Sequence, residues 1–383
     1  MRIVIDVDVL ANSPKTGVYY YVQRLASALL DLDRSNDYVL TYLNAANSDG
    51  EFGLPAGNAR IKKVTWLPRT VYHLLLRTPF APPFDLVTGT AGDIFVFTKF
   101  VRWPLLRRSK SLVVVYDTTY LDTPEAVENW HFRRYLRWAV PRSIRRASQV
   151  IAISESTKRS LMRHYGTSAD KISVVTPALD HTMFAPSTSD QIDAVRAKHG
   201  IDKPYILSVG TIEPRKNLVG LLRAFALTSE EFNQKYALVL VGGKGWLDEQ
   251  INELYEQLSK RMTIIRTGYV PSDELPALYS GASVFVYPSL FEGFGMPPLE
   301  AMACGTPVIT ADNSSLPEVV GDAGILVEAT DAAQLAREMQ ELLADPERAA
   351  ELRAKGLARA QSFTWEASAK ELLGVMNDVA AKG

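Results

Sequence analysis

The sequence predicts an α/β protein built from two doubly wound, parallel-sheet domains that face a central cleft. Three observations point to this fold class. The 383 residues suffice for two domains of ordinary size. In both halves of the chain, short apolar runs alternate with stretches of helical pattern, which is typical of a parallel sheet covered by helices on both faces. Between the halves, a stretch with Pro, Ser, Thr and Asp is typical of a linker.

The first half contains the strand pattern five times, at residues 3–5, 39–43, 111–116, 149–154 and 172–175. A loop with Gly17 and a helix over residues 18–30 follow the first strand, and another helix separates the last two strands. These elements place the first domain at residues 1–180. The linker at residues 181–203 contains Pro186 and has room for one short helix.

The second half repeats the pattern, with strands at residues 205–210, 237–241, 263–265, 283–287 and 308–310. Asn217 is expected to cap a helix that runs to about Leu227. The second domain therefore covers residues 204–362, and a last helix occupies residues 363–383. Doubly wound sheets bind ligands beyond the carboxyl ends of their strands, so the cleft between two such domains is the expected site.

The composition excludes several classes of protein. The chain is 47% hydrophobic and 22% charged, as globular proteins are. It has no run of about 18 apolar residues, which predicts that no helix spans a membrane. The first ten residues resemble a strand and not a signal peptide. Cys304 is the only cysteine, which excludes an internal disulfide and a cysteine-based zinc site, and the five histidines lack metal-ligand spacing. We expect a cytoplasmic protein without a bound metal.

Charge is distributed unevenly along the chain. Residues 1–185 carry 24 Lys/Arg and 16 Asp/Glu, whereas the remainder carries 18 and 27, although the net charge is only −1. This asymmetry indicates that the first half meets an anionic partner, unless the solvated faces of the halves differ by chance. The chain contains no nucleic-acid-binding motif, so we expect no nucleic acid to bind.

Two segments of the first half mix aromatic and basic residues at helical spacing, at residues 66–84 and 129–147. Such a pattern predicts interfacial helices that lie on an anionic membrane surface. The alternative is that each helix packs on the core and has a basic outer face.

The most informative segment is residues 291–309, FEGFGMPPLEAMACGTPVI. After a strand that ends near Tyr287, two glycines form a loop, prolines favour the start of a short helix, and Gly305 lies just past its end. Free backbone N–H groups at such a helix start suit a phosphate or a sugar hydroxyl. Glu292 on the loop and Glu300 in the helix can reach different parts of one extended ligand. A lone Glu is more often a solvated surface residue, but this pair lies in a glycine-framed, otherwise apolar segment.

A second segment, VGTIEPRKN at residues 209–217, places Arg215 and Lys216 between the end of a strand and the start of a helix. The guanidinium fork of Arg and the point charge of Lys together suit a diphosphate. Adjacent Arg and Lys residues are also common on protein surfaces, so this pattern alone is only moderately specific.

Together these segments resemble glycosyltransferase family 4, whose members are retaining enzymes with the GT-B fold of two Rossmann-like domains. The resemblance covers nearly the whole chain. It includes Glu292 and Glu300 with GFGMPPL between them, and EPRKN at residues 213–217. Further matches are GYVP at residues 268–271, LPEV at 316–319 and FTW at 363–365. The family also implies that the last helix crosses back to the first domain.

The resemblance implies a role for each conspicuous residue. Arg215 and Lys216 would hold the donor diphosphate, Glu300 would bind the ribose and Glu292 would lie near the donor sugar. The other donor-binding residues implied are Gly17, Tyr269, Val270, Phe294, Gly295, Met296 and Leu299. Two cations and a helix start can stabilise the departing diphosphate, so we expect no metal cofactor. Carboxylates near the anomeric carbon can stabilise an oxocarbenium-like transition state.

The acceptor side departs from the family pattern. Tyr116 stands where many relatives have His, and a phenol can hydrogen-bond to a sugar but is a poor base near neutral pH. Asp117 is the acceptor-contacting candidate and joins Glu292, Lys216 and Arg215 in the predicted catalytic set, unless it only forms a turn. Ser154 is a further acceptor candidate, with helix capping as the alternative. Residues 6–8, DVD, resemble a metal motif, but we expect a structural or acceptor-facing role.

The sequence therefore predicts a retaining hexosyltransferase. It would move a hexose, which we expect to be mannose from GDP-mannose, to a sugar hydroxyl of a glycan or lipid-linked saccharide. One alternative is a UDP-sugar donor. Another is a non-catalytic protein of the same fold that binds a sugar nucleotide or a glycan. A nucleotide-sugar epimerase is disfavoured by the pair of glutamates.

Overall fold

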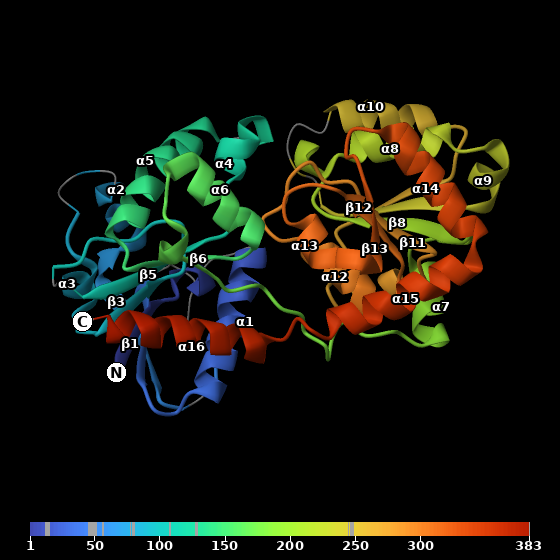
Figure 1. Cartoon of the computed structure of the whole chain (residues 1–383). Helices are drawn as coiled ribbons and strands as arrows, with labels where there is room; N and C mark the ends of the chain where they lie inside the picture. The colour runs from blue at the N-terminus through green and yellow to red at the C-terminus, as the bar shows by residue number, and fades with distance from the viewer. Residues whose placement is uncertain are drawn as a thin grey trace. The chain divides into compact units, whose positions relative to one another are not determined.

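The structure is a computed structural model that describes residues 1–11, 16–44, 52–55, 57–76, 78, 81–106, 109–126, 129–243, 245 and 249–382. The chain divides into two compact units (Figure 1). Unit 1 comprises Met1–Ala178 and Thr364–Gly383, and unit 2 comprises Leu179–Phe363. Unit 2 is thus one continuous segment, whereas unit 1 is assembled from both ends of the chain.

Unit 1 is built on a parallel sheet with the strand order β3-β2-β1-β4-β5-β6-β7. Its strands are β1 (Arg2–Asp6), β2 (Asp37–Asn44), β3 (Ala59–Pro68), β4 (Ile94–Phe97), β5 (Lys110–Val115), β6 (Gln149–Ala152) and β7 (Ile172–Val174). The strand runs predicted at residues 3–5, 39–43, 111–116, 149–154 and 172–175 are confirmed, and β3 and β4 were not predicted.

Helices and turns cover the sheet of unit 1. They are η1 (Asp8–Ala11), α1 (Gly17–Leu32), α2 (Arg69–Leu75), α3 (Phe84–Thr88), α4 (Thr119–Asp122), η2 (Pro124–Ala126), α5 (Trp130–Arg146), α6 (Glu155–Tyr165), η3 (Ala169–Lys171) and α16 (Trp365–Ala381). On one side of the sheet, aromatic rings of Tyr72, Phe84 and Trp103 meet edge to face, with centroids 4.8 Å apart for each contact with Trp103. Such pairs add to the stabilisation by apolar burial.

Unit 2 contains a parallel sheet with the strand order β10-β9-β8-β11-β12-β13. Its strands are β8 (Tyr205–Val209), β9 (Ala237–Val241), β10 (Ile264–Gly268), β11 (Val284–Tyr287), β12 (Val308–Ala311) and β13 (Gly324–Val327). Its helices and turns are α7 (Ser189–Lys198), η4 (Pro214–Lys216), α8 (Leu218–Leu227), α9 (Glu230–Lys235), α10 (Glu249–Leu258), α11 (Leu275–Gly281), α12 (Met296–Ala303), α13 (Leu316–Val320), η5 (Gly321–Ala323), α14 (Ala332–Ala344) and α15 (Pro346–Ala360). The predicted fold class, two doubly wound parallel-sheet units, is confirmed.

The last helix, α16, packs within unit 1 against α1 (Figure 1). The ring of Trp365, its first residue, meets that of Tyr21 on α1 with centroids 5.9 Å apart. The hydroxyl of Ser368 donates to the backbone oxygen of Thr176, 2.7 Å away. The two ends of the chain thus complete one fold.

The interfacial helix predicted over residues 66–84 is wrong. Strand β3 runs to Pro68, where it still pairs with β2, and a separate short helix, α2, follows. Proline removes a backbone donor and fixes φ, and Pro82 and Pro83 precede α3, so no single helix can cover this segment. Residues 77, 79 and 80 lie outside the described residues.

The helix predicted over residues 129–147 is confirmed as α5, and the Asn129 side chain caps it by accepting a hydrogen bond from the Phe132 N–H. One face of the helix packs into the core through Leu136, Val140 and Ile144. Trp130, Phe132, Trp138 and five of the six arginines of the helix are exposed.

Candidate active site

The candidate site lies at the carboxyl edge of the unit 2 sheet, where the strand order reverses. Strands β8 and β11 are neighbours, but the chain continues from them toward opposite edges of the sheet. A doubly wound sheet forms a ligand-binding crevice at such a switch point. The loop after β8 carries Arg215 and Lys216, and the loop after β11 carries Glu292. The Leu290 N–H donates to the Arg215 backbone oxygen at 2.8 Å, which joins the two loops.

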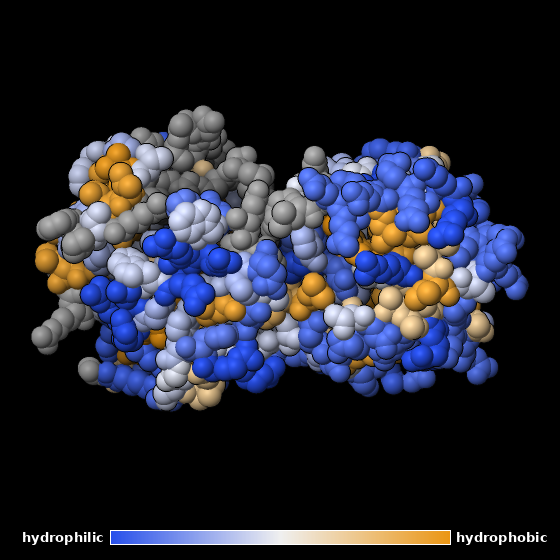
Figure 2. Space-filling model, turned by 90° about the horizontal axis from the view of Figure 1, so that it is seen from above, coloured by the Kyte–Doolittle hydropathy of each residue, from blue (hydrophilic) through white to orange (hydrophobic). Residues whose placement is uncertain are grey.

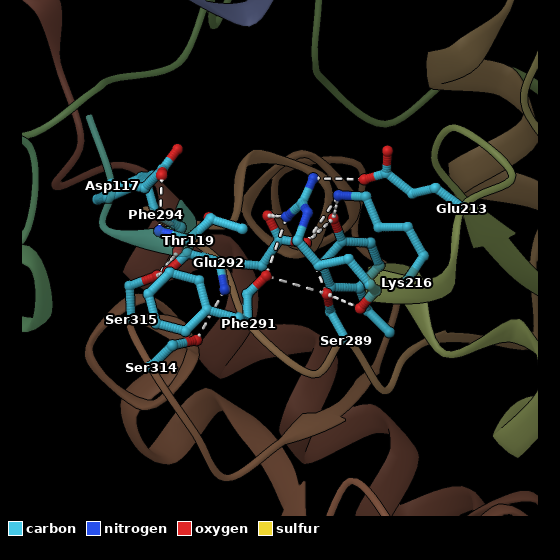
Figure 3. A network of polar contacts seen from close by, with 12 residues as sticks. Asp117, Thr119, Glu213, Lys216, Ser289, Phe291, Glu292, Phe294, Ser314 and Ser315 are labelled. Carbon is cyan, nitrogen blue, oxygen red and sulfur yellow. Dashed lines mark hydrogen bonds and ion pairs between the residues drawn. The ribbon is translucent and has the colours of Figure 1, made fainter. Parts of the chain in front are cut away.

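An ion cluster connects these loops (Figure 3). The Arg215 guanidinium places Nη1 2.7 Å from Oε2 of Glu292 and Nη2 2.6 Å from Oε1 of Glu213. The Lys216 ammonium lies 2.7 Å from Oε1 of Glu292 and donates to the Tyr287 hydroxyl at 2.5 Å. Hydroxyls of Tyr287 and Ser289 also donate to Oε1 of Glu292, at 2.8 and 2.7 Å. The structure therefore brings together three of the predicted catalytic residues, Arg215, Lys216 and Glu292.

Burial makes the electrostatics of this cluster strong. Glu292 is only 8% exposed. Burial alone would raise the pKa of Glu292, but Lys216 and Arg215 outweigh it and lower that pKa to about 2. Burial lowers the pKa of Lys216, and Glu292 opposes this shift. Burial acts to lower the pKa of Arg215, but Glu292 and Glu213 raise it above its ordinary value. Glu292 and Arg215 are thus both ionised at neutral pH.

Two consecutive serines after β12 hold the loop that carries Glu292 (Figure 3). Ser314 accepts from the Glu292 N–H at 3.0 Å, and its φ of 49° is unusual for a residue other than Gly. The buried hydroxyl of Ser315 lies 2.9 Å from the Glu292 backbone oxygen and 2.6 Å from that of Phe294. The sequence did not predict these serines, nor Tyr287 and Ser289, because their contacts depend on which strands become neighbours.

The start of α12 follows this loop directly. Gly295, the N-cap residue, has a φ of 113°, and a Cβ there would lie 2.8 Å from the Leu316 side chain, so glycine is required. The side chains of Phe294 and Leu299 are buried and serve packing, while Met296 is half-buried. Contact of the Phe294 and Gly295 backbone amides with a ligand stays a prediction.

Glu300 lies on α12, away from the ion cluster. The Tyr279 hydroxyl donates to its Oε2 at 2.8 Å. Burial raises the pKa of Glu300 to about 7, and the hydrogen bond from Tyr279 opposes the rise only in part. Near neutral pH this carboxyl therefore changes between a neutral acid and an anion that can accept hydrogen bonds from hydroxyl groups.

We expect Glu300 to make folding stability depend on pH. The folded chain holds this proton more tightly than the unfolded chain, in which the pKa is near 4.5. The resulting stability is present below pH 4.5 and is lost as the pH rises to about 7, a loss on the order of 3 kcal/mol. In Glu300→Gln we expect this part of the pH dependence of the free energy of unfolding to disappear. Urea unfolding at pH 5 and pH 8 measures the difference, with the exposed Glu256→Gln as the control. Equal slopes in Glu300→Gln and the wild type would contradict the assignment.

The residues predicted beside the base follow β10, the edge strand two positions from β8. Tyr269 is 77% exposed, whereas Val270 is buried. Neither joins the ion cluster, and their contact with a nucleotide stays a prediction.

The predicted acceptor residues all lie in unit 1. The buried Tyr116 hydroxyl donates to the backbone oxygen of Thr98 at 2.7 Å, and burial raises its pKa well above 10. Half-buried Asp117 accepts from the Thr119 N–H at 2.9 Å, as a turn-forming Asp does (Figure 3). Fully buried Ser154 caps α6 by accepting from the Thr157 N–H at 3.0 Å. The structure therefore gives each of the three a structural contact, and their acceptor roles stay predictions.

Two other features predicted in unit 1 lie near its own switch point. Gly17 is the first residue of α1, and a Cβ there would meet open space. Asp8 is fully buried and pairs with Lys99 at 2.6 Å, and Asp6 accepts from the Asp8 N–H. This pairing fits the structural role expected for residues 6–8. Over the described part of the chain, no three His, Cys, Asp or Glu side chains group as metal ligands.

Comparisons with known proteins agree with this architecture. Residues 6–183 match the model of Glycosyltransferase Family 4, and residues 191–359 match that of Glycosyl transferases group 1. O-antigen chain mannosyltransferase B of Escherichia coli is 35% identical over 264 residues, which are 68% of each protein. Serotype-specific mannosyltransferase WbdA of E. coli is 34% identical over 223 residues, 57% of this chain but only 27% of that longer protein.

Solved structures share the fold at low sequence identity. Sucrose-phosphate synthase from Thermosynechococcus elongatus has a TM-score of 0.75 at 22% identity, with 100% of both chains covered. WaaG, a glycosyltransferase involved in lipopolysaccharide biosynthesis, has a TM-score of 0.69 at 15% identity, also with 100% of both chains covered. The fold is therefore that of the GT-B glycosyltransferases. The chain belongs to glycosyltransferase family 4, and the family predicted from its motifs is confirmed.

Proposed function

We propose that this glycosyltransferase is a retaining hexosyltransferase that moves mannose from GDP-mannose to a sugar hydroxyl of a glycan or lipid-linked saccharide. The observation that carries the proposal is the buried cluster of Arg215, Lys216 and Glu292 at the switch point of unit 2. The mannosyltransferase names of the relatives support the choice of sugar.

In the proposed reaction, Arg215 and Lys216 bind the diphosphate of the donor. As the bond between the anomeric carbon and the phosphate oxygen breaks, negative charge develops on the leaving diphosphate. The two cations already lie together at the sheet edge, so they stabilise this charge without reorganisation. The acceptor hydroxyl oxygen forms the new bond to the anomeric carbon, and its proton passes to an oxygen of the leaving diphosphate. Because the cations neutralise the leaving group, we propose that transfer needs no metal.

Glu292 has two tasks in this proposal. Without a donor it is the counter-ion of both cations. When phosphate oxygens take its place on the cations, the hydroxyls of Tyr287 and Ser289 still hold its carboxylate, which can face the positive charge that develops on the sugar. Asp117 is the proposed contact of the acceptor hydroxyl, and Tyr116 and Ser154 of the same unit are the further acceptor candidates.

Thermal unfolding with GDP and with UDP, each with and without Mg²⁺, tests the donor assignment. A ligand that binds only the folded chain at 100 times its Kd stabilises it by about 2.7 kcal/mol. We expect GDP to raise the Tm without Mg²⁺ and UDP to have a smaller effect. Stabilisation by UDP alone would point to a UDP-sugar donor. Stabilisation without turnover of any nucleotide sugar would point to a non-catalytic binding protein.

We further propose that α5 lies on the headgroups of an anionic membrane. The helix carries six arginines and no acidic residue. Trp130, Phe132 and Trp138 on the same helix are 48, 46 and 42% exposed. Arg134 and Arg142 stack over Trp130 and Trp138, with the guanidinium carbon 5.2 and 4.3 Å from the ring centroid. Over unit 1, Figure 2 shows strongly hydrophilic groups beside hydrophobic ones. Aromatic rings among cations suit a lipid headgroup layer.

No helix in the described ranges has the length and apolarity needed to cross a membrane. Contact with lipid through α5 would therefore be peripheral and sensitive to salt.

We expect the chain to sediment with vesicles that contain phosphatidylglycerol at low salt, but not with neutral vesicles. Each Arg near an anionic surface contributes about 1 kcal/mol, so Arg134→Gln/Arg142→Gln should bind roughly 30-fold more weakly. The matched control is Arg223→Gln/Arg337→Gln, which removes two exposed arginines from unit 2. Equal sedimentation of the two double variants would remove α5 from the proposal.

A further inference from the structure

Glu213 is a buried carboxylate inside a site proposed to bind anions. It is 2% exposed and stands two residues before Arg215 on the loop after β8. Its Oε1 lies 2.6 Å from Nη2 of Arg215 (Figure 3). Its backbone oxygen accepts from the Lys216 N–H at 3.1 Å, so the same residue also shapes the turn that presents both cations.

The two terminal nitrogens of the Arg215 guanidinium, Nη1 and Nη2, have different partners. Nη1 is shared between Glu292 and the backbone oxygen of Phe291, at 2.7 and 2.9 Å. Nη2 is held by Glu213. When a diphosphate replaces Glu292 as the partner of Nη1, the Nη2 contact remains. Arg215 thus stays in place while its other partner changes.

We propose that Glu213 is a positioning residue. It holds the guanidinium of Arg215 in place and weakens the affinity of the site for the diphosphate product. This inference rests on the proposed function. The cluster contains two basic and two acidic side chains, and Glu292 is the one that a diphosphate displaces. Glu213 stays and repels the phosphates at short range, where burial limits screening by salt. A moderate affinity for the leaving nucleotide lets the product depart after each turnover.

The substitution Glu213→Gln removes the charge of this side chain but keeps its size and shape. The amide oxygen can still accept from Nη2 of Arg215, but the negative charge is gone. We expect GDP, or UDP if that is the nucleotide the wild type binds, to bind about tenfold more tightly by calorimetry, since close charge pairs inside proteins are worth this much or more. We also expect kcat and the KM for the donor to fall together, because product release slows. Glu256→Gln is the matched control and should change none of these quantities.

A second variant, Glu213→Asp, keeps the charge but shortens the side chain. We expect its affinity for the nucleotide not to rise and its kcat to fall, because Arg215 is less well held. Unchanged or weaker nucleotide binding by folded Glu213→Gln would overturn the proposal, as would tighter binding by Glu213→Asp. Failure of both variants to fold would show a structural role and would also overturn it. If the wild type binds neither nucleotide, the proposed function itself fails before any variant is compared.

Discussion

Lys216→Ala should abolish detectable glycosyl transfer while the chain remains folded. The ammonium lies 2.7 Å from Glu292, at the position proposed for the diphosphate. Removing one group that stabilises developing charge typically costs a factor of about 10² to 10³ in kcat. The loss here should be at the upper end, because the substitution also leaves Glu292 with one cation instead of two. Initial rates with the nucleotide sugar measure it, and circular dichroism checks the fold.

The control for this substitution is Lys260→Ala, an exposed lysine of the same unit. It should retain the activity of the wild type. Turnover by Lys216→Ala at the rate of that control would refute the assignment of Lys216 to the diphosphate.

Glu292→Gln should lose transfer by a factor of about 10² to 10⁴, the range typical for a carboxylate that acts at the reacting centre. Nucleotide binding should nevertheless persist or become tighter. The amide can keep accepting hydrogen bonds from Tyr287 and Ser289, so the loop keeps its shape. The two cations, however, lose the counter-ion with which a diphosphate must compete. Transfer rates and calorimetric titration with GDP and UDP measure the two effects separately.

The loss of transfer together with retained or tighter nucleotide binding also distinguishes Glu292 from Glu213. Both substitutions remove a buried negative charge beside Arg215, so both should favour the nucleotide. Only Glu292→Gln should abolish the chemical step, which a single-turnover experiment measures without product release. Wild-type single-turnover rates in Glu292→Gln would mean that this carboxylate acts only as a counter-ion.

The sequence predicted the strands whose apolar runs are continuous, because these strands are buried on both faces. It missed β3, an edge strand in which Arg60, Lys62 and Lys63 interrupt the apolar pattern. It also missed β4 and β13, which have four residues each, although strands as short as β7 were predicted. The pairing of β1 with β4 joins residues about 90 positions apart, which local pattern does not show.

The candidate site, like the fold, could be predicted from the sequence only in part. Arg215, Lys216 and Glu292 are recognisable because Gly and Pro punctuate the loops around them. The partners that set their charge and position come from elsewhere in the fold. Ser314 and Ser315 reach the Glu292 loop only because β12 lies beside β11. The raised pKa of Glu300 likewise follows from burial in the folded chain, and Tyr279, whose hydrogen bond partly opposes the rise, lies on a different helix.

The placement of α16 has a consequence for the order in which the protein forms during synthesis. Unit 2 is continuous, so all of its residues have been made once Phe363 has been added. Synthesis of unit 1 begins before that of unit 2, but unit 1 lacks the helix that covers Tyr21 until residues 365–381 have been translated. Domains fold as whole units on the ribosome, so unit 1 is completed after unit 2. A premature stop directly after Phe363 would therefore leave unit 2 whole but remove α16 from unit 1.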